Sequence, residues 1–139
     1  MITNSRNQRG LSVHKTYQMF MGLFGVTVIF IAMLHILYGP SVIPGSIPVN
    51  ATMDSEDRFY ATIFLGYGAA LLWCVRDIER KSRVVYLLAG IFFAGGLSRL
   101  MSMADVGMPI AFFIIMTILE LIIPFFMVFM QWRITKQWG

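Results

Sequence analysis

The sequence has little charge and almost no cysteine. Charged residues make up 13% of its 139 residues, whereas soluble domains carry about 25%. A soluble globular domain is therefore excluded. The single cysteine, Cys74, cannot form an intramolecular disulfide, and we expect it to be a small apolar filler of the core.

Several motifs that carry chemistry are also absent. The sequence has no serine–histidine or cysteine–histidine motif and no glycine-rich phosphate loop. It lacks the HxxxH and CxxC spacings of common metal sites, and we expect no cofactor. The net charge of +4 is not gathered in a basic patch on a soluble fold, so no nucleic-acid partner is expected.

Long apolar runs dominate the chain. Hydrophobic residues make up 58% of it, and the mean hydropathy is +0.72. A helix that spans a lipid bilayer needs about 20 apolar residues. The sequence predicts one integral membrane domain over residues 1–139, an all-α antiparallel bundle of four transmembrane helices. The expected spans are about 17–38, 59–75, 84–103 and 109–130, after a short polar tail over residues 1–16.

Lysine and arginine predict the orientation. The amino-terminal tail carries three of them, the connector at 76–83 four, and the carboxyl-terminal tail two. Because cytoplasmic loops are enriched in these residues, we expect both termini and this connector to be cytoplasmic. Aromatic residues fit belts at both boundaries: Tyr17, Trp73, Trp132 and Trp138 inside, Tyr38 and Tyr60 outside. The apolar run at 17–38 has no small-residue cleavage site, so we expect it to remain as the first span.

Small residues predict close contacts between the helices. Gly66 and Ala70, and Gly90 and Ala94, have the small-xxx-small spacing, which Gly95-Gly96 extends. Ordinary packing within the bundle explains the pattern, with a homodimer or another membrane-protein partner as the alternative. The proline-rich segment 39–49 is expected to lie on the membrane surface or to plug the mouth of the bundle.

An acidic run opens the second span. Asp54 or Ser55 is expected to cap that helix. Arg58 follows Asp54 by four residues, which predicts a local ion pair. Glu56 and Asp57 complete the run.

Arg99 lies in the outer third of the third span. An unpaired arginine at this depth is costly, and a long side chain can extend towards the boundary. We therefore predict that Arg99 pairs with Asp54 or Asp57. Together with Glu56 and Arg58 these residues would form a structural clamp. The alternative is that Arg99 reaches lipid head groups.

Glu120 lies near the membrane midplane in the fourth span. Pro124, four residues later, lacks an N–H and so frees the backbone carbonyl of Glu120. The two groups could build a polar pocket for water, a proton or a cation. The alternative is a neutral Glu120 hydrogen-bonded inside the bundle, with Thr117 as its partner.

His35 lies near the outer end of the first span. A lone histidine there is usually a hydrogen-bonded packing residue. His35, Asp54 and Glu120 are weak candidates for a metal site, because no ligand spacing supports one.

The sequence resembles a known family along spans two to four and, less closely, span one. The matching residues are Asn50, the run from Asp54 to Tyr60, Gly66-Tyr67-Gly68, Leu72-Trp73, the run from Gly95 to Leu100, Ser102, Gly107 and Pro109. The chain is similar to an uncharacterised family of small bacterial four-span proteins, domain-of-unknown-function family 4345. The resemblance implies a four-helix inner-membrane protein and brings no activity. The layout is more distantly similar to DoxX-like and sterol-isomerase-type proteins.

Three functions remain open at this point. The first is a non-enzymatic envelope factor that binds a small lipophile, lipid or partner protein in an outward-facing polar pocket formed by Glu120, Arg99, His35, Asp54 and Asp57. The second is a proton-coupled transporter of small lipophilic molecules, working as a dimer, with Glu120 as the proton carrier. The third is a membrane enzyme, either an isomerase using Glu120 as acid and base or a metal-dependent hydrolase using His35 and the acids.

Overall fold

The structure is a computed structural model that describes the backbone of residues 2–138 and the side chains of residues 10–137. Its helices are α1 (Ile2–Tyr38), the 3-10 turn η1 (Gly39–Val42), α2 (Ala51–Val75), α3 (Ser82–Val106) and α4 (Ala111–Trp138). No strand occurs in this part of the chain. The side chains of Arg6, Arg9 and Trp138, which entered the predicted orientation, lie outside the described residues.

Four helices of the described chain are long and apolar enough to cross a membrane. They cover Gly10–Val42, Ala51–Val75, Ser82–Val106 and Ala111–Gln137. The protein is therefore an all-α, multi-pass membrane protein with four spans, as predicted. The side of the membrane on which the termini lie remains a prediction.

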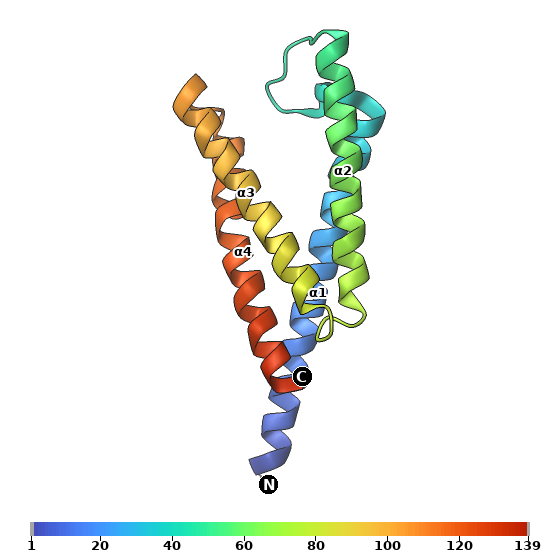
Figure 1. Ribbon diagram of the computed structural model, residues 1–139, viewed down its shortest axis with the longest axis vertical. Helices are drawn as coiled ribbons and strands as arrows, with labels where there is room; N and C mark the ends of the chain where they lie inside the picture. The colour runs from blue at the N-terminus through green and yellow to red at the C-terminus, as the bar shows by residue number, and fades with distance from the viewer. Residues whose placement is uncertain (1, 139) are drawn as a thin grey trace. The chain divides into compact units, whose positions relative to one another are not determined.

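The chain divides into two compact units, Met1–Arg76 and Asp77–Gly139. The first, called here the N-terminal hairpin, pairs α1 with α2 through η1 and the loop that follows it. The second, the C-terminal hairpin, pairs α3 with α4 across a short turn. In Figure 1 the second helix of each hairpin runs back along the first, so the two are antiparallel. The single domain predicted for residues 1–139 stays a prediction.

Two helix starts differ from the predictions. Helix α1 begins at Ile2, so residues 2–16 of the expected tail are helical. Helix α2 begins at Ala51 because Asn50, with an extended backbone, accepts the N–H of Met53 on its side chain at 2.9 Å. The prediction that Asp54 or Ser55 caps α2 was wrong, since both lie inside the helix. Asp54 nevertheless lies in the first turn, where an acid suits the helix dipole.

The turn of the C-terminal hairpin lies later in the chain than expected. Helix α3 continues to Val106, three residues beyond the predicted end of the third span at residue 103. Gly107 then adopts a φ of +112°, and its N–H donates to the carbonyl of Met103. Glycine tolerates this left-handed conformation without a steric penalty. Helix α4 begins at Ala111, just after Pro109.

Helices α1 and α2 approach each other closely at two glycines. A Cβ added to Gly25 would lie 3.2 Å from the carbonyl oxygen of Gly68, and one added to Gly68 would lie 3.1 Å from that of Gly25. At the predicted contact residue, Gly66, an added Cβ would meet no atom of its own hairpin within 4 Å. The close contact is thus made by Gly25 and Gly68. Buried Tyr17, Met21, Leu71 and Cys74 continue this core.

Helices α3 and α4 approach each other closely at Gly96. A Cβ added there would lie 2.9 Å from Cδ2 of Leu121 and 3.2 Å from Cβ of Glu120. Gly90 and Gly95 would meet no atom of their own hairpin within 4 Å. Of the predicted small-residue contacts, Gly96 therefore packs against α4, and it brings the backbone of α3 close to Glu120.

Candidate functional site

An ion pair inside the C-terminal hairpin joins α3 to α4. Nε of Arg99 donates to Oε2 of Glu120 at 2.7 Å. Arg99 lies seven residues before the end of α3, and Glu120 lies nine residues after the start of α4. At a rise of 1.5 Å per residue, both are about 10–14 Å from the turn. The pair is thus placed at the same level of the hairpin, well inside its apolar length.

The two partners differ in exposure. The side chain of Glu120 is 14% exposed and that of Arg99 is 42% exposed. Arginine is always protonated in proteins, so the contact places a cation against the carboxyl of Glu120. Thr117, the partner considered for Glu120, donates its hydroxyl to the carbonyl of Phe113 at 2.8 Å.

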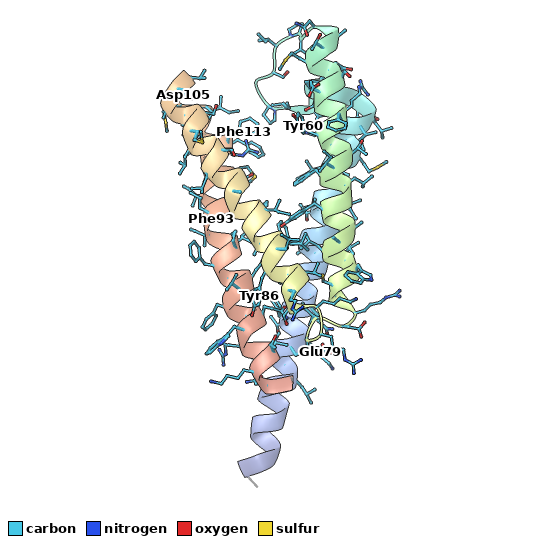
Figure 2. All side chains as sticks on the ribbon, viewed as in Figure 1. Tyr60, Glu79, Tyr86, Phe93, Asp105 and Phe113 are labelled. Carbon is cyan, nitrogen blue, oxygen red and sulfur yellow. The ribbon has the colours of Figure 1, made fainter. Side chains whose placement is uncertain are left out.

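Arg99 also faces an aromatic ring and a cavity. Its Cζ lies 5.5 Å from the ring centre of Phe113, within range of a cation–π contact. Phe113, labelled in Figure 2, lies on α4 near the turn of the hairpin, on the same end as Asp105 of α3. A cavity of about 380 Å³ opens at this end.

Polar side chains and the turn form the wall of this cavity, which we call the turn cavity. The polar lining residues are Arg99, Ser102 and Thr117; the others are Met103, Val106, Gly107, Met108, Pro109 and Phe113. Glu120 is not among them, but it accepts from Nε of Arg99. Arg99 is therefore the charged side chain that lines the cavity, and Glu120 is linked to the cavity through this contact.

Pro124 lies inside α4 and is buried, and the helix continues beyond it to Trp138. The sequence predicted a polar pocket where Pro124 frees the carbonyl of Glu120. In the structure the carboxyl of Glu120 turns to Arg99 on α3. The polar cavity lies on the turn side of this pair.

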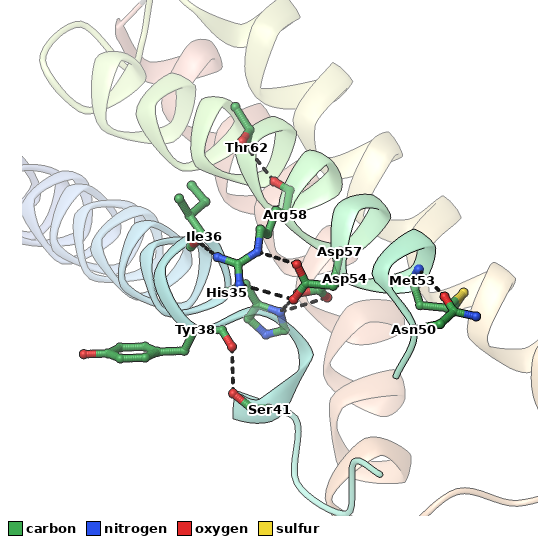
Figure 3. A network of polar contacts seen from close by, with 10 residues as sticks. All are labelled: His35, Ile36, Tyr38, Ser41, Asn50, Met53, Asp54, Asp57, Arg58 and Thr62. Atoms are coloured by element: carbon green, nitrogen blue, oxygen red, sulfur yellow. Dashed lines mark hydrogen bonds and ion pairs between the residues drawn. The ribbon is translucent and has the colours of Figure 1, made fainter. Parts of the chain in front are cut away.

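A second polar network closes the loop end of the N-terminal hairpin (Figure 3). Nδ1 of His35 lies 3.0 Å from Oδ2 of Asp57. Nε and Nη2 of Arg58 donate to the two carboxylate oxygens of Asp54 at 2.8 and 3.2 Å, so the predicted local pair of Asp54 and Arg58 is present. Nη1 of Arg58 donates to the carbonyl of Ile36 at 2.5 Å. The network thus fastens the start of α2 to the end of α1.

Glycine at position 39 allows this network to form. Gly39 has a φ of +61° and is buried at the start of η1. A Cβ at this position would collide with Oδ1 of Asp54 and lie 3.0 Å from Nη2 of Arg58. The backbone of Gly39 therefore packs directly on the ion pair.

The structure corrects the predicted partner of Arg99. We expected Asp54 or Asp57, but Arg99 pairs with Glu120, while Asp54 holds Arg58 and Asp57 holds His35. The reason is local: each acid has a basic partner within its own hairpin, where short connections already bring the groups together. Glu56, also expected in the clamp, is exposed on α2.

Each weak metal candidate contacts a partner within its own hairpin. Among the described residues, no group of three or more histidine, cysteine, aspartate or glutamate side chains is placed to hold a metal ion. His35 contacts a single carboxylate, Asp57, and the carboxylates of Asp54 and Glu120 each bind an arginine.

Two glutamines that the sequence analysis did not single out close the other end of each hairpin. Nε2 of Gln18 on α1 donates to the carbonyl of Val75 at 2.8 Å. Nε2 of Gln131 on α4 donates to the carbonyl of Ile78 at 2.7 Å, and lies 3.1 Å from Oγ of Ser82. The sequence feature that could have identified both residues is an amide side chain within an apolar run. A polar side chain in a membrane span commonly forms a hydrogen bond to a neighbouring helix.

Four apolar helices in two hairpins, with an arginine-lined cavity inside one of them, define a helical multi-pass membrane protein. The chain belongs to the family described as Domain of unknown function (DUF4345), whose model matches residues 16–131. This confirms the resemblance found in the sequence. A search of curated proteins and a search of solved structures each gave no match.

Proposed function

We propose that this protein is a non-enzymatic factor of the bacterial inner membrane that binds a small lipophilic molecule in the turn cavity. The observation that carries the proposal is the position of Arg99. A guanidinium 42% exposed lines a cavity of about 380 Å³ inside a spanning hairpin. Ionisable groups at such depth are costly, and they generally mark a functional site.

The cavity has the properties of a small-molecule site. Ligand pockets measure about 300–1,000 Å³ and combine apolar walls with a few placed polar groups. Here Met103, Val106 and Phe113 supply apolar surface, while Arg99 and Ser102 supply hydrogen-bonding groups. Nε of Arg99 donates to Glu120. The guanidinium has two further amino groups that can donate to a ligand.

The charge distribution supports an outward-facing cavity. The connector at 76–83 carries four lysine or arginine residues, and the positive-inside rule assigns it to the cytoplasm. The α3–α4 turn lies at the opposite end of both helices, so the cavity would open towards the outer surface. His35, Asp54 and Asp57 fasten α1 to α2 within the N-terminal hairpin, and their place in the pocket stays a prediction. A homodimer or a membrane-protein partner stays a prediction.

Binding is favoured over the two other functions considered. Proton-coupled transport required a carboxyl of Glu120 that exchanges protons with its surroundings, whereas this carboxyl is engaged by Arg99. An isomerase using Glu120 required the carboxyl to reach the ligand, whereas Glu120 is not among the residues that line the cavity.

Photo-crosslinking in neutral-lipid nanodiscs tests the proposal. A long-chain alcohol bearing a diazirine should label peptides that line the cavity, as identified by mass spectrometry. Ser102→Phe fills the cavity and should abolish this labelling. Ser98→Phe is the matched control, because Ser98 is an exposed serine of α3 outside the lining. Equal labelling of the two variants, or labelling confined to other surfaces, would refute the proposal.

A further inference from the structure

The charge balance at the turn cavity constrains the ligand. Arg99 is the charged group among the lining residues. Glu120, one contact behind it, carries the opposite charge and binds it at 2.7 Å. The pair is therefore electrically neutral as a unit, although the member that lines the cavity, Arg99, has a head group with N–H donors and no acceptor.

An anionic head group would disturb this balance. It would add a third charge to an already neutral pair, in apolar surroundings where an uncompensated charge is strongly disfavoured. A hydroxyl, carbonyl or ether oxygen can accept from the guanidinium without adding charge. The ring of Phe113, 5.5 Å from Cζ of Arg99, offers its electron-rich face to the same cation, which further reduces the need for an anion.

We infer that Glu120 makes the turn cavity selective for amphiphiles whose head group is uncharged and accepts hydrogen bonds. Glu120 is thus a specificity-determining residue that acts through Arg99. Without its carboxylate the cavity would present an unbalanced cation and would favour anions. The inference rests on the proposed binding function and adds the chemical class of the ligand to it.

The test compares two diazirine probes with the same alkyl chain, one ending in a hydroxyl group and the other in a sulfonate, which stays charged at all working pH values. With the full-length protein in neutral-lipid nanodiscs, the alcohol should label the cavity peptides about tenfold more than the sulfonate, equivalent to about 1.4 kcal/mol. Glu120→Gln should bring the ratio of alcohol labelling to sulfonate labelling down to about one or below it.

Two further variants separate charge from structure. Glu79→Gln makes the same chemical change at the opposite end of the hairpin from Phe113 (Figure 2) and should leave the preference unchanged. The double variant Arg99→Gln, Glu120→Gln is again neutral and should retain the preference for the alcohol. If Glu120→Gln does not fold, the wild-type ratio still tests the inference.

The outcomes separate this inference from the proposed function. Equal or stronger labelling of wild-type cavity peptides by the sulfonate would overturn the inference and leave lipophile binding intact. An unchanged preference in folded Glu120→Gln would also overturn it. Absence of cavity labelling by both probes would overturn the proposed function, and the inference with it.

Discussion

Breaking the pair between Arg99 and Glu120 should destabilise the C-terminal hairpin. Glu120→Leu leaves a guanidinium without its carboxylate inside the spanning segment. Losing one partner of a fully buried pair costs about 3–5 kcal/mol, whereas exposed pairs contribute about 0–1 kcal/mol. Glu120 is 14% exposed and Arg99 is 42% exposed. Because Arg99 is only partly enclosed by its own hairpin, we expect a loss between these two limits, about 2 kcal/mol.

A double-mutant cycle isolates the interaction. Arg99→Leu combined with Glu120→Leu removes both charges, and replacing a buried pair by apolar residues is often neutral for stability. The double variant should therefore be more stable than Glu120→Leu alone. The measurement is the free energy of unfolding from titration with a denaturing detergent, followed by helical circular dichroism.

The N-terminal hairpin offers a control for this cycle. Asp54 and Arg58 form an ion pair four residues apart with both side chains 40% exposed, and such helical pairs are worth about 0.3–0.5 kcal/mol. Their coupling should be clearly smaller. A coupling between Arg99 and Glu120 below about 0.5 kcal/mol, the range in which independent sites are additive, would refute the reasoning.

Two glycine substitutions provide further tests by the same unfolding measurement. Gly96→Ala forces a Cβ to within 2.9 Å of Leu121 and should cost about 1–3 kcal/mol. Gly95→Ala, with open space at the same level, should instead gain about 0.5–1 kcal/mol; equal effects would contradict the packing described. Gly39→Ala places a Cβ against Asp54 at a positive φ and should cost at least about 1–2 kcal/mol. A neutral Gly39→Ala would show that the contact with Asp54 is not maintained.

Partner choice was the part of the site that sequence patterns could not supply. The prediction for Arg99 rested on depth along one helix and on an outward direction of its side chain. Arg99 was placed in the outer third of its span and Glu120 near the midplane, which treated them as belonging to different levels. The short turn at Gly107 brings both to the same level of the hairpin, and the close packing at Gly96 brings the two backbones together. Neither effect can be read from the spacing of charges.

Local pairs were more predictable than long-range ones. Asp54 and Arg58 are one helical turn apart, so their contact follows from helix geometry alone. The contact between His35 and Asp57 requires α1 and α2 to meet at a particular rotation, and the sequence analysis did not find it. The cap at Asn50 was not predicted, because acidic residues are favoured at helix starts and the three acids after Asn50 indicated a later start of α2.

The sequence by itself determined that this protein is a four-span helical membrane protein, because apolar runs of spanning length with few charges have no other stable solution in a bilayer. It also identified Arg99 and Glu120, since ionisable groups in such runs are costly enough to stand out. Only the tertiary structure decided that these two residues neutralise each other and that the arginine faces the turn cavity. The reason is that rotation and closeness of two helices are set by packing at Gly96 and by the turn at Gly107, which fix side-chain partners within a few ångströms.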